Sequence, residues 1–433
     1  MEDISDANHL TKHPTRNPFS SDPSKAALAF IFVTVALDML AVGMIVPVLP
    51  GLVKSFLGGD SAQAAKMLGV FGTVWSLMQF LFSPLLGSLS DRFGRRPVIL
   101  LSNFGTGVDY FVMALAPTLN ILFLGRVISG VTSASIPTAM AYIADVTPIA
   151  QRAAGFGMVS AAFGLGFVLG PAFGGMLGNV SPRLPFWVAG ALSLANALYG
   201  LLVLPESLPR ASRGRFSWFR ANPAGGIGML RLRPNLLALG AVMFLGYLAH
   251  QVFEVYVLYA QYRYRWDDRA VGLSLAAVGI FSALVGAAMV KPVVDRLGDR
   301  VTMLAGLLFG SLGFAIFGVA SNGTAFLFGI PVMNLWGLAG PTAQGLMSRD
   351  VGPAEQGQLQ GAISALRGIA GLIGPILFTF VFARFITGIA GWRVPGAPFY
   401  LAAALLFGSL LLALRVTRDD PIASSTLDAQ PGS

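Results

Sequence analysis

Long apolar runs without charged side chains dominate the chain. Residues 67–90, 153–182 and 301–348 extend for 24, 30 and 48 residues without Asp, Glu, Lys or Arg. About 20 apolar residues cross a bilayer as a helix, so each run is long enough for one span and the longest for two. A membrane β-barrel would show short segments of alternating hydrophobicity instead. The pattern therefore predicts membrane-spanning helices.

Twelve charge-poor segments divide the chain, and they predict an all-α membrane protein with 12 transmembrane helices. The longest run is divided at residues 321–324, where Ser, Asn and Gly favour a turn. An even number of spans places both ends of the chain on one side of the membrane. The segments are 26–53, 67–90, 97–125, 121–144, 153–182, 184–205, 234–259, 270–290, 301–320, 324–348, 356–383 and 394–414.

Composition and charge placement exclude a soluble enzyme and orient the chain. Hydrophobic residues make up 55% and charged residues 11%, less than half the usual ~25%. Of the 29 Lys and Arg residues, 19 fall on the side of the two ends, eight in the other loops and two inside spans. Basic loops stay in the cytoplasm, so both termini are predicted to be cytoplasmic. The net charge of +9 then faces lipid headgroups, and nucleic acid is not needed to explain it.

The order of spans and polar segments predicts five regions. Residues 1–24 have no apolar core or cleavage pattern, so the first span is expected to direct insertion. The absence of cysteine excludes disulfides and thiol chemistry. The regions are a flexible cytoplasmic tail at 1–25, a six-helix half at 26–205, a cytoplasmic linker at 206–233, a second six-helix half at 234–416 and a second tail at 417–433.

An internal repeat relates the two halves at an offset of 204 residues. Four loci recur at this spacing, whereas the abundance of Gly and Pro in membrane helices would explain only one such coincidence. Six spans lie between equivalent points, so the halves are parallel and pseudo-symmetric, as in transporters with a central site between halves. The loci are Asp91-Arg92-Phe93-Gly94 with Asp295-Arg296-Leu297-Gly298, Pro137-Thr138-Ala139 with Pro341-Thr342-Ala343, Gly164 with Gly368, and Gly170-Pro171 with Gly374-Pro375.

The loop from Gly87 to Arg96 carries the first of these loci. Its composition alone also fits an ordinary basic loop that sets topology. Its order of residues resembles the signature loop of the major facilitator superfamily, although Lys291 stands where the repeat would place a second glycine. The resemblance implies a cytoplasmic gate in which, with the cytoplasmic side closed, Asp91 lies against the start of span eleven and Arg95 approaches Asp145. The gate residues are Gly87, Asp91, Arg92, Gly94, Arg95, Asp145, Asp295 and Arg296.

The glycine-rich run from Gly164 to Gly175 lies inside an apolar span. It follows no strand and lacks a GK[ST] ending, which excludes a phosphate loop. Small residues let helices approach closely, and a proline lets one bend. The run resembles the antiporter signature of drug-efflux major facilitators. The predicted bending residues are Gly170, Pro171, Gly374 and Pro375.

Residues 108–147, 263–280 and 356–378 resemble the tetracycline/proton antiporters of bacterial inner membranes, within a similarity that extends over roughly 28–415. The resemblance implies functional carboxylates at Asp38 and Asp109 and an arginine of span four at Arg126. It also shows two departures: Gly310 and Ser282 stand where the family has an aspartate and a histidine. Those two groups are implicated in binding tetracycline as a divalent-cation chelate, so the substrate is left open.

Charged side chains inside spans are the candidate working groups, because each costs ~2.5–3.5 kcal/mol to insert. Asp38 is the expected proton carrier: an arginine neighbour favours its charged form, and loss of that neighbour favours protonation. A static Asp38–Arg126 pair and a helix-packing hydrogen bond at Asp109 remain as alternatives. The residues predicted to couple protons are Asp38, Arg126 and Asp109.

Span seven adds His250 and Glu254, which lie four residues apart and would share one helix face. Arg367 of span eleven would neutralise Glu254. These groups could also lie wetted near the outer mouth without a role in transport. The predicted substrate cavity comprises Asp38, Asp109, His250, Glu254 and Arg367, with Phe253, Tyr256, Tyr259, Phe281 and Trp336 as apolar lining.

The resulting hypothesis is proton-driven efflux of a hydrophobic drug-like compound by a monomer in the bacterial inner membrane. Its partners are a small-molecule substrate, protons and the lipid bilayer, and it needs no cofactor or metal. Proton-coupled uptake or export of another small molecule and a non-transporting sensor are the alternatives. A membrane enzyme is not favoured, because the chain has only three histidines, two of them in the N-terminal tail.

Overall fold

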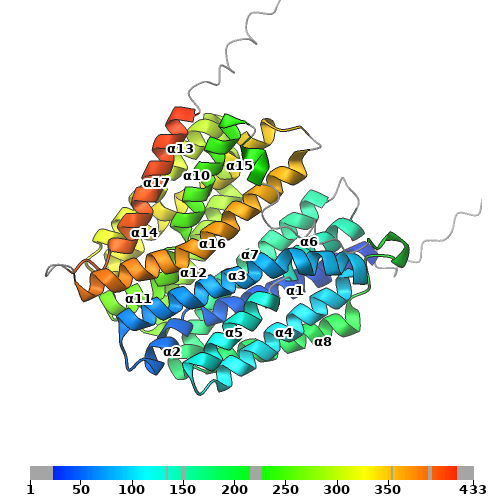
Figure 1. Cartoon of the computed structure of the whole chain (residues 1–433), viewed down its shortest axis with the longest axis horizontal. Helices are drawn as coiled ribbons and strands as arrows, with labels where there is room; N and C mark the ends of the chain where they lie inside the picture. The colour runs from blue at the N-terminus through cyan, green and yellow to red at the C-terminus, as the bar shows by residue number, and fades with distance from the viewer. Residues whose placement is uncertain are drawn as a thin grey trace, which may run out of the picture.

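A computed structural model describes residues 23–416 except 133–134, 148–151, 215–226, 232, 353–354 and 389–392. Most of the first predicted tail, all of the second and part of the linker lie outside these residues. Residues 23–25, predicted as tail, instead begin the first helix. In the part described, every regular element is a helix (Figure 1). The α-helices of the first half are α1 (Pro23–Ile45), α2 (Leu49–Phe56), α3 (Ser61–Phe93), α4 (Arg95–Leu115), α5 (Leu119–Thr132), α6 (Ser135–Val146), α7 (Arg152–Val180) and α8 (Leu184–Val203). The later ones are α9 (Ile227–Leu230), α10 (Pro234–His250), α11 (Phe253–Tyr264), α12 (Asp268–Leu284), α13 (Val290–Val319), α14 (Gly323–Asn334), α15 (Ala339–Arg349), α16 (Gln356–Thr387) and α17 (Ala397–Val416).

The predicted twelve spans are confirmed. Eleven helical segments among the described residues are long and apolar enough to cross a membrane, and the one from Asp268 to Val319 is 52 residues long. That segment contains two spans, because the backbone leaves the helical region at Gly298, where φ is 76°. The predicted end of the third span at 125 is wrong: α4 ends at Leu115. Pro117 disfavours helical geometry at the residue before it, and Ala116 is accordingly non-helical with ψ 115°.

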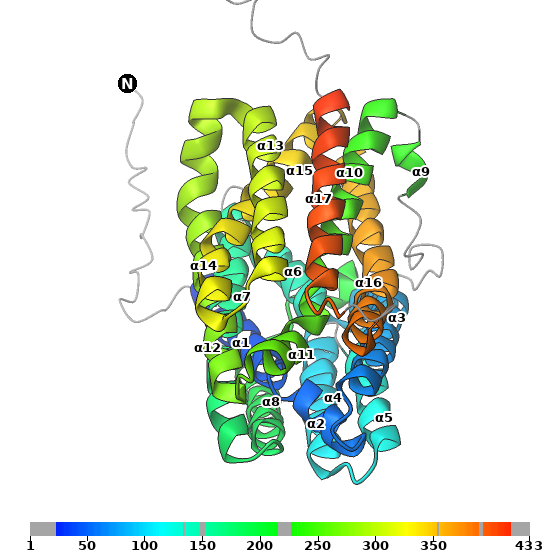
Figure 2. The same cartoon turned by 90° about the vertical axis from the view of Figure 1, so that its left-hand side faces the viewer.

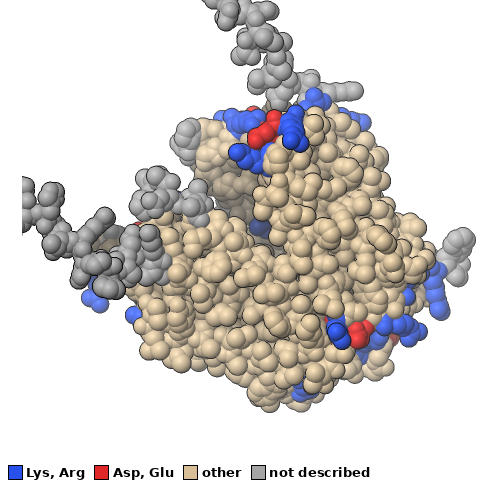
Figure 3. All heavy atoms as spheres, turned by 180° about the vertical axis from the view of Figure 1, so that it is seen from behind, with Lys and Arg blue, Asp and Glu red and all other residues tan. Residues whose placement is uncertain are grey.

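The outside of the bundle is apolar. Large hydrophobic side chains stay exposed on it, among them Val180 at 78%, Leu202 at 76% and Phe328 at 75%. In the space-filling view, charged atoms gather at the two ends and the wall between them is uncharged (Figure 3). Such a surface is unfavourable in water and suits lipid. The chain is therefore a multi-pass membrane protein.

The 204-residue repeat is visible in the backbone. Gly94 and Gly298, which close the two copies of the Asp-Arg-x-Gly sequence, both have positive φ, at 108° and 76°. This region favours glycine because it has no Cβ. The first span of each half is also broken at the equivalent place, between α1 and α2 at residues 46–48 and between α10 and α11 at 251–252. The halves α1–α8 and α10–α17 thus share local geometry as well as sequence.

The two halves meet at one end of the bundle and separate at the other. We call the end that carries Gly94 and the start of α10 the linker end, and the other the opposite end (Figures 1 and 2). Toward the opposite end, Thr73 of α3 donates a hydrogen bond to the Leu372 carbonyl of α16 (3.1 Å), and α7 packs on α12 with Gly175 against Gly272.

Toward the linker end the same two helix pairs no longer touch. Open space adjoins glycines on α3, α7 and α16 and on the π-helical turn that follows α12, and the space-filling view shows a hollow between the halves (Figure 3). These glycines are Gly87, Gly157, Gly164, Gly286, Gly357 and Gly361. The structure is therefore closed at the opposite end and open at the linker end.

An aromatic core holds the second half together near the opposite end. Tyr259 donates its hydroxyl proton to the Phe317 carbonyl (2.8 Å), and Tyr256 donates to the Ser274 hydroxyl (3.0 Å). Both tyrosines are fully buried. Their predicted place in the cavity lining is wrong, because their polar ends are satisfied within the half and their rings pack on Phe326.

Candidate functional site

Arg126 of α5 lies between carboxylates from different halves. It interacts electrostatically with Asp109 of α4 and with Glu254 of α11. Its guanidinium also covers the Trp75 ring of α3 at 5.6 Å. Asp109 has no exposed surface, and the groups that act on its carboxylate are the charge of Arg126 and a side-chain hydrogen bond from Ser129. A buried carboxylate with so few polar partners depends on the nearby cation for its charge.

Gly125 explains how Asp109 approaches α5 so closely. A Cβ built at Gly125 would lie 2.8 Å from a carboxylate oxygen of Asp109, which is too close. Asp38 of α1 belongs to the same neighbourhood: it is 6% exposed and, with Asp109 and Arg126, acts electrostatically on the buried Tyr110. The structure thus brings together the three residues expected to couple protons.

Glu254 reaches from the second half into the first. It occupies the first turn of α11, where the unpaired N–H groups of a helix start favour a negative charge. One of its oxygens would lie 3.1 Å from a Cβ built at Gly72 of α3. The predicted partner, Arg367, instead contacts Tyr247, with its guanidinium 4.9 Å from the ring centre and a nitrogen 3.4 Å from the hydroxyl. Glu254 therefore faces Arg126 across the two halves.

The prediction that His250 and Glu254 share one helix face is wrong. α10 ends at His250, and the turn that follows makes a tighter bond, from the Val252 amide to the Ala249 carbonyl (3.1 Å). This turn changes the direction of the chain, so the four-residue spacing no longer places the two side chains on one face.

His250 belongs to a separate group in the second half. Its ring lies 5.3 Å from Phe253 and 5.9 Å from Trp336, and the charge of Arg367 acts on it. The side chains of His250 and Arg367 are both exposed, whereas most exposed side chains between the two ends of the bundle are apolar. Figure 3 shows basic side-chain atoms on the floor of the hollow between the halves.

The two departures from the antiporter pattern have different surroundings. A Cβ built at Gly310 of α13 would lie 2.7 Å from Trp336 and 2.8 Å from Leu406, so the space for a larger side chain is filled. Ser282 of α12 is exposed. Where the family has an aspartate, this chain thus has Gly310 with the ring of Trp336 packed against it.

The loop at the linker end forms an ion-pair network. Arg95 contacts Asp91 at 2.5 Å and Asp145 at 3.1 Å, and its backbone amide donates to Glu206 (2.8 Å). The contact between Arg95 and Asp145, expected for a state closed at this end, is already present in this open state. Asp91 is half exposed and pairs within its own half. Its expected position against span eleven concerns a state closed at this end and stays a prediction.

A second network in the other half was missed from the sequence. Arg349 pairs with Asp299, and these positions lie 204 residues after Asp145 and Arg95. The pair is therefore repeated with its charges reversed. A search for recurring identical residues overlooks it, whereas a search for opposite charges at the repeat offset would find it. Glu206 was also missed, because it lies in a loop without a motif.

The glycine and proline pairs of the repeat lie at close helix contacts. A Cβ built at Gly170 of α7 would lie 2.7 Å from the Cα of Gly43 in α1, so only glycine permits this approach. Gly374 lies against Gln251 in the second half. α7 and α16 continue through Pro171 and Pro375, and bending during transport stays a prediction.

Comparisons with known proteins agree with this architecture. Residues 31–375 match the Major Facilitator Superfamily model. The chain is 39% identical over 385 residues to the class C tetracycline resistance protein of Escherichia coli, covering 87% of this chain and 95% of that protein. It is 34% identical over 404 residues to the class D protein of Salmonella ordonez, covering 93% and 100%. The solved nucleoside transporter NupG superposes with a TM-score of 0.73 at 14% identity, covering 92% and 100%. With this match over most of its length, the chain belongs to the Major Facilitator Superfamily, in the group that includes the tetracycline resistance proteins.

Proposed function

We propose that the protein is a proton-driven efflux transporter of the tetracycline type, acting in the bacterial inner membrane by alternating access. The relatives named as tetracycline resistance proteins support the substrate class. The observation that carries the mechanism is the position of Arg126 between Asp109 of one half and Glu254 of the other. The superfamily consists of transporters, and no enzymatic step is part of the proposal.

Arg126 exchanges partners as the halves rock. With both termini cytoplasmic, the linker end faces the cytoplasm, and the present state admits substrate from that side. Here Arg126 is shared by Asp109 and Glu254. When the linker end closes and the opposite end opens, Glu254 leaves with the second half. Arg126 then remains with Asp109 and Asp38, and this shift in counter-charge changes which carboxylate holds a proton.

The remaining residues bind substrate or close the gate. His250 and Arg367, with Tyr247 and Trp336 beside them, form the second-half wall of the substrate cavity. Closure brings Asp91 to the start of α16, where unpaired N–H groups favour a carboxylate. Residues 26–205 and 234–416 move as two units of a monomer, connected by the linker at 206–233.

Inverted membrane vesicles test this function directly. We expect added tetracycline to accumulate in energised vesicles and to release protons from them, and a protonophore to abolish both effects. Vesicles from cells without the protein provide the control. Saturable binding without proton release would indicate a sensor, and accumulation only in right-side-out vesicles would indicate uptake.

Transport is expected to continue when divalent cations are chelated. A Mg²⁺ chelate prefers oxygen ligands, yet Trp336 fills the space at Gly310, and no group of three His, Asp or Glu in the described residues could hold a metal ion. Glu254→Gln should lower the coupled export of every substrate, because Arg126 loses a partner. It should in addition raise KM about tenfold for cationic substrates, the effect of ~1.4 kcal/mol, and much less for neutral ones.

Glu355→Gln is the matched control for this test, because Glu355 pairs with Arg233 at the linker end (3.1 Å), away from the site. Strict Mg²⁺ dependence, together with wild-type behaviour of Glu254→Gln, would contradict this assignment of Glu254.

A further inference from the structure

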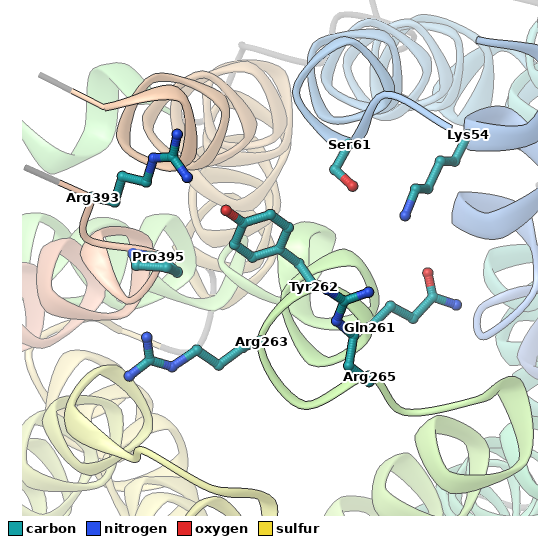
Figure 4. A pocket seen from close by; sticks show the side chains of 8 residues that line it. All are labelled: Lys54, Ser61, Gln261, Tyr262, Arg263, Arg265, Arg393 and Pro395. Carbon is teal, nitrogen blue, oxygen red and sulfur yellow. The ribbon is translucent and has the colours of Figure 1, made fainter. Parts of the chain in front are cut away.

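A basic pocket lies at the opposite end of the bundle, where the two halves meet. Its volume is about 570 Å³, and both halves line it (Figure 4). Lys54 of α2 and Ser61 of α3 come from the first half. The second half contributes Gln261, Tyr262, Arg263 and Arg265 from the end of α11, and Arg393 and Pro395 from the segment before α17. The lining thus holds four basic side chains and no acidic one.

The nearby carboxylates already have hydrogen-bond partners. Asp60 caps α3 by accepting bonds from the amides of Ala62 (2.8 Å) and Gln63 (3.1 Å), and the Gln63 amide lowers its pKa. Asp267 caps α12, and Asp268 accepts a bond from Gln261 (3.0 Å). Among the residues described, no ion pair is found for the four basic side chains of the pocket.

The backbone at Arg265 is unusual. Its φ of 58° and ψ of 29° place it in the left-handed region, and it is the only described residue other than glycine with positive φ. Glycine or asparagine is favoured at such a helix end. The left-handed backbone disfavours any residue with a Cβ, yet an arginine occupies this position. Its positive charge lies beside Arg263 and opposite Arg393. Strain of this kind often accompanies a binding site.

We propose that this pocket binds a phosphate-bearing anion and that the bound anion stabilises the state open at the linker end. Guanidinium groups bind phosphate through paired N–H donors, and Lys54 and Ser61 complete the set from the other half. The volume is within the range of small-ligand pockets and exceeds what a bare phosphate fills. The source of the anion is either free phosphate or the headgroup of an anionic lipid.

The coupling to conformation follows from the two-half lining. Lys54 belongs to one half and the three arginines to the other, so closure of the opposite end brings like charges together. An anion between them replaces this repulsion with attraction. When the opposite end opens, the pocket divides and its affinity is lost. A ligand that binds only one state shifts the equilibrium by its binding free energy.

Spin labels at Gly157→Cys and Gly361→Cys would report the opening. Both glycines adjoin open space on facing halves at the linker end, and the natural chain has no cysteine to label. We expect inorganic phosphate, added to purified protein in neutral detergent, to raise the ratio of open to closed molecules about tenfold at roughly ten times its Kd. Phosphatidylglycerol in phosphatidylcholine nanodiscs provides the lipid arm. An effect of phosphate supports a free anion, and an effect of the lipid alone supports a headgroup.

Arg263→Gln and Arg393→Gln should each weaken the response about tenfold, whereas Lys66→Gln, which removes a positive charge at the same end but outside the pocket, should leave it unchanged. Arg265→Gly should also lose the response while its unfolding temperature stays equal or rises, because glycine suits the left-handed backbone; this separates loss of binding from misfolding. The proposal would be overturned if neither phosphate nor phosphatidylglycerol changed the open fraction, or if the pocket variants responded like Lys66→Gln. None of these measurements requires transport, so they stand apart from the proposed function.

Discussion

Asp38→Asn is expected to abolish proton-coupled export while the protein still reaches the membrane. The amide has nearly the volume of the carboxyl group but cannot carry a proton. Asp38 is 6% exposed and lies in the same buried neighbourhood as Asp109 and Arg126, where a gain or loss of charge changes the balance of the whole group. We expect uphill export in vesicles to fall about 100-fold or more, the usual minimum for loss of a proton-transfer group.

Two variants make this result specific. Asp38→Glu keeps a titratable group and should retain part of the coupled export. Asp60→Asn makes the same chemical change at the cap of α3, where asparagine caps equally well, and should export normally. Equilibrium binding or downhill exchange of substrate should persist in Asp38→Asn. Undiminished uphill export by this variant, at normal expression, would remove Asp38 from the proton path.

Hydropathy predicted the spans because lipid imposes length and composition on each helix separately. The same reasoning failed at residues 116–125, where Pro117 ends α4 although the chain remains apolar. The repeat could also be recognised from the sequence, because the backbone has positive φ at both Gly94 and Gly298 and this conformation favours glycine at each. Features imposed by one segment's own chemistry were thus predictable.

Contacts between segments were not predictable in this way. Spacing suggested that His250 and Glu254 share one helix face, and Arg367 of the same half was expected to neutralise Glu254. A turn at 251–252 separates the two side chains, and Glu254 instead interacts with Arg126 in the other half. The pair of Asp299 and Arg349 escaped notice because its charges are reversed relative to the first half. The basic pocket collects residues from 54 to 395. Arg263 and Arg265 lie in a segment of the family resemblance, but nothing in the sequence places them beside Lys54 and Arg393. Each of these features depends on which helices meet.

Arg126→Gln is expected to abolish export and to destabilise the protein. The variant leaves Asp109 with no exposed surface and without the charge of Arg126, and removing one partner of a buried pair costs roughly 3–5 kcal/mol. A second substitution in the same protein, Asp109→Asn, removes the carboxylate charge that Arg126→Gln leaves unpaired. The double variant should therefore recover most of the lost stability. Thermal unfolding in detergent measures this recovery, and vesicle export measures function.

The double variant separates a static pair from a working one. If Arg126 and Asp109 only hold helices α4 and α5 together, restoring stability restores export. If Arg126 exchanges between Asp109, Asp38 and Glu254 during the cycle, the double variant folds but does not couple protons, because the moving cation is gone. Recovery of both stability and uphill export in the same protein would therefore contradict the proposed exchange. Recovery of stability alone would support it, since the folded transporter would then lack only the two charges, of Arg126 and Asp109, that take part in the exchange.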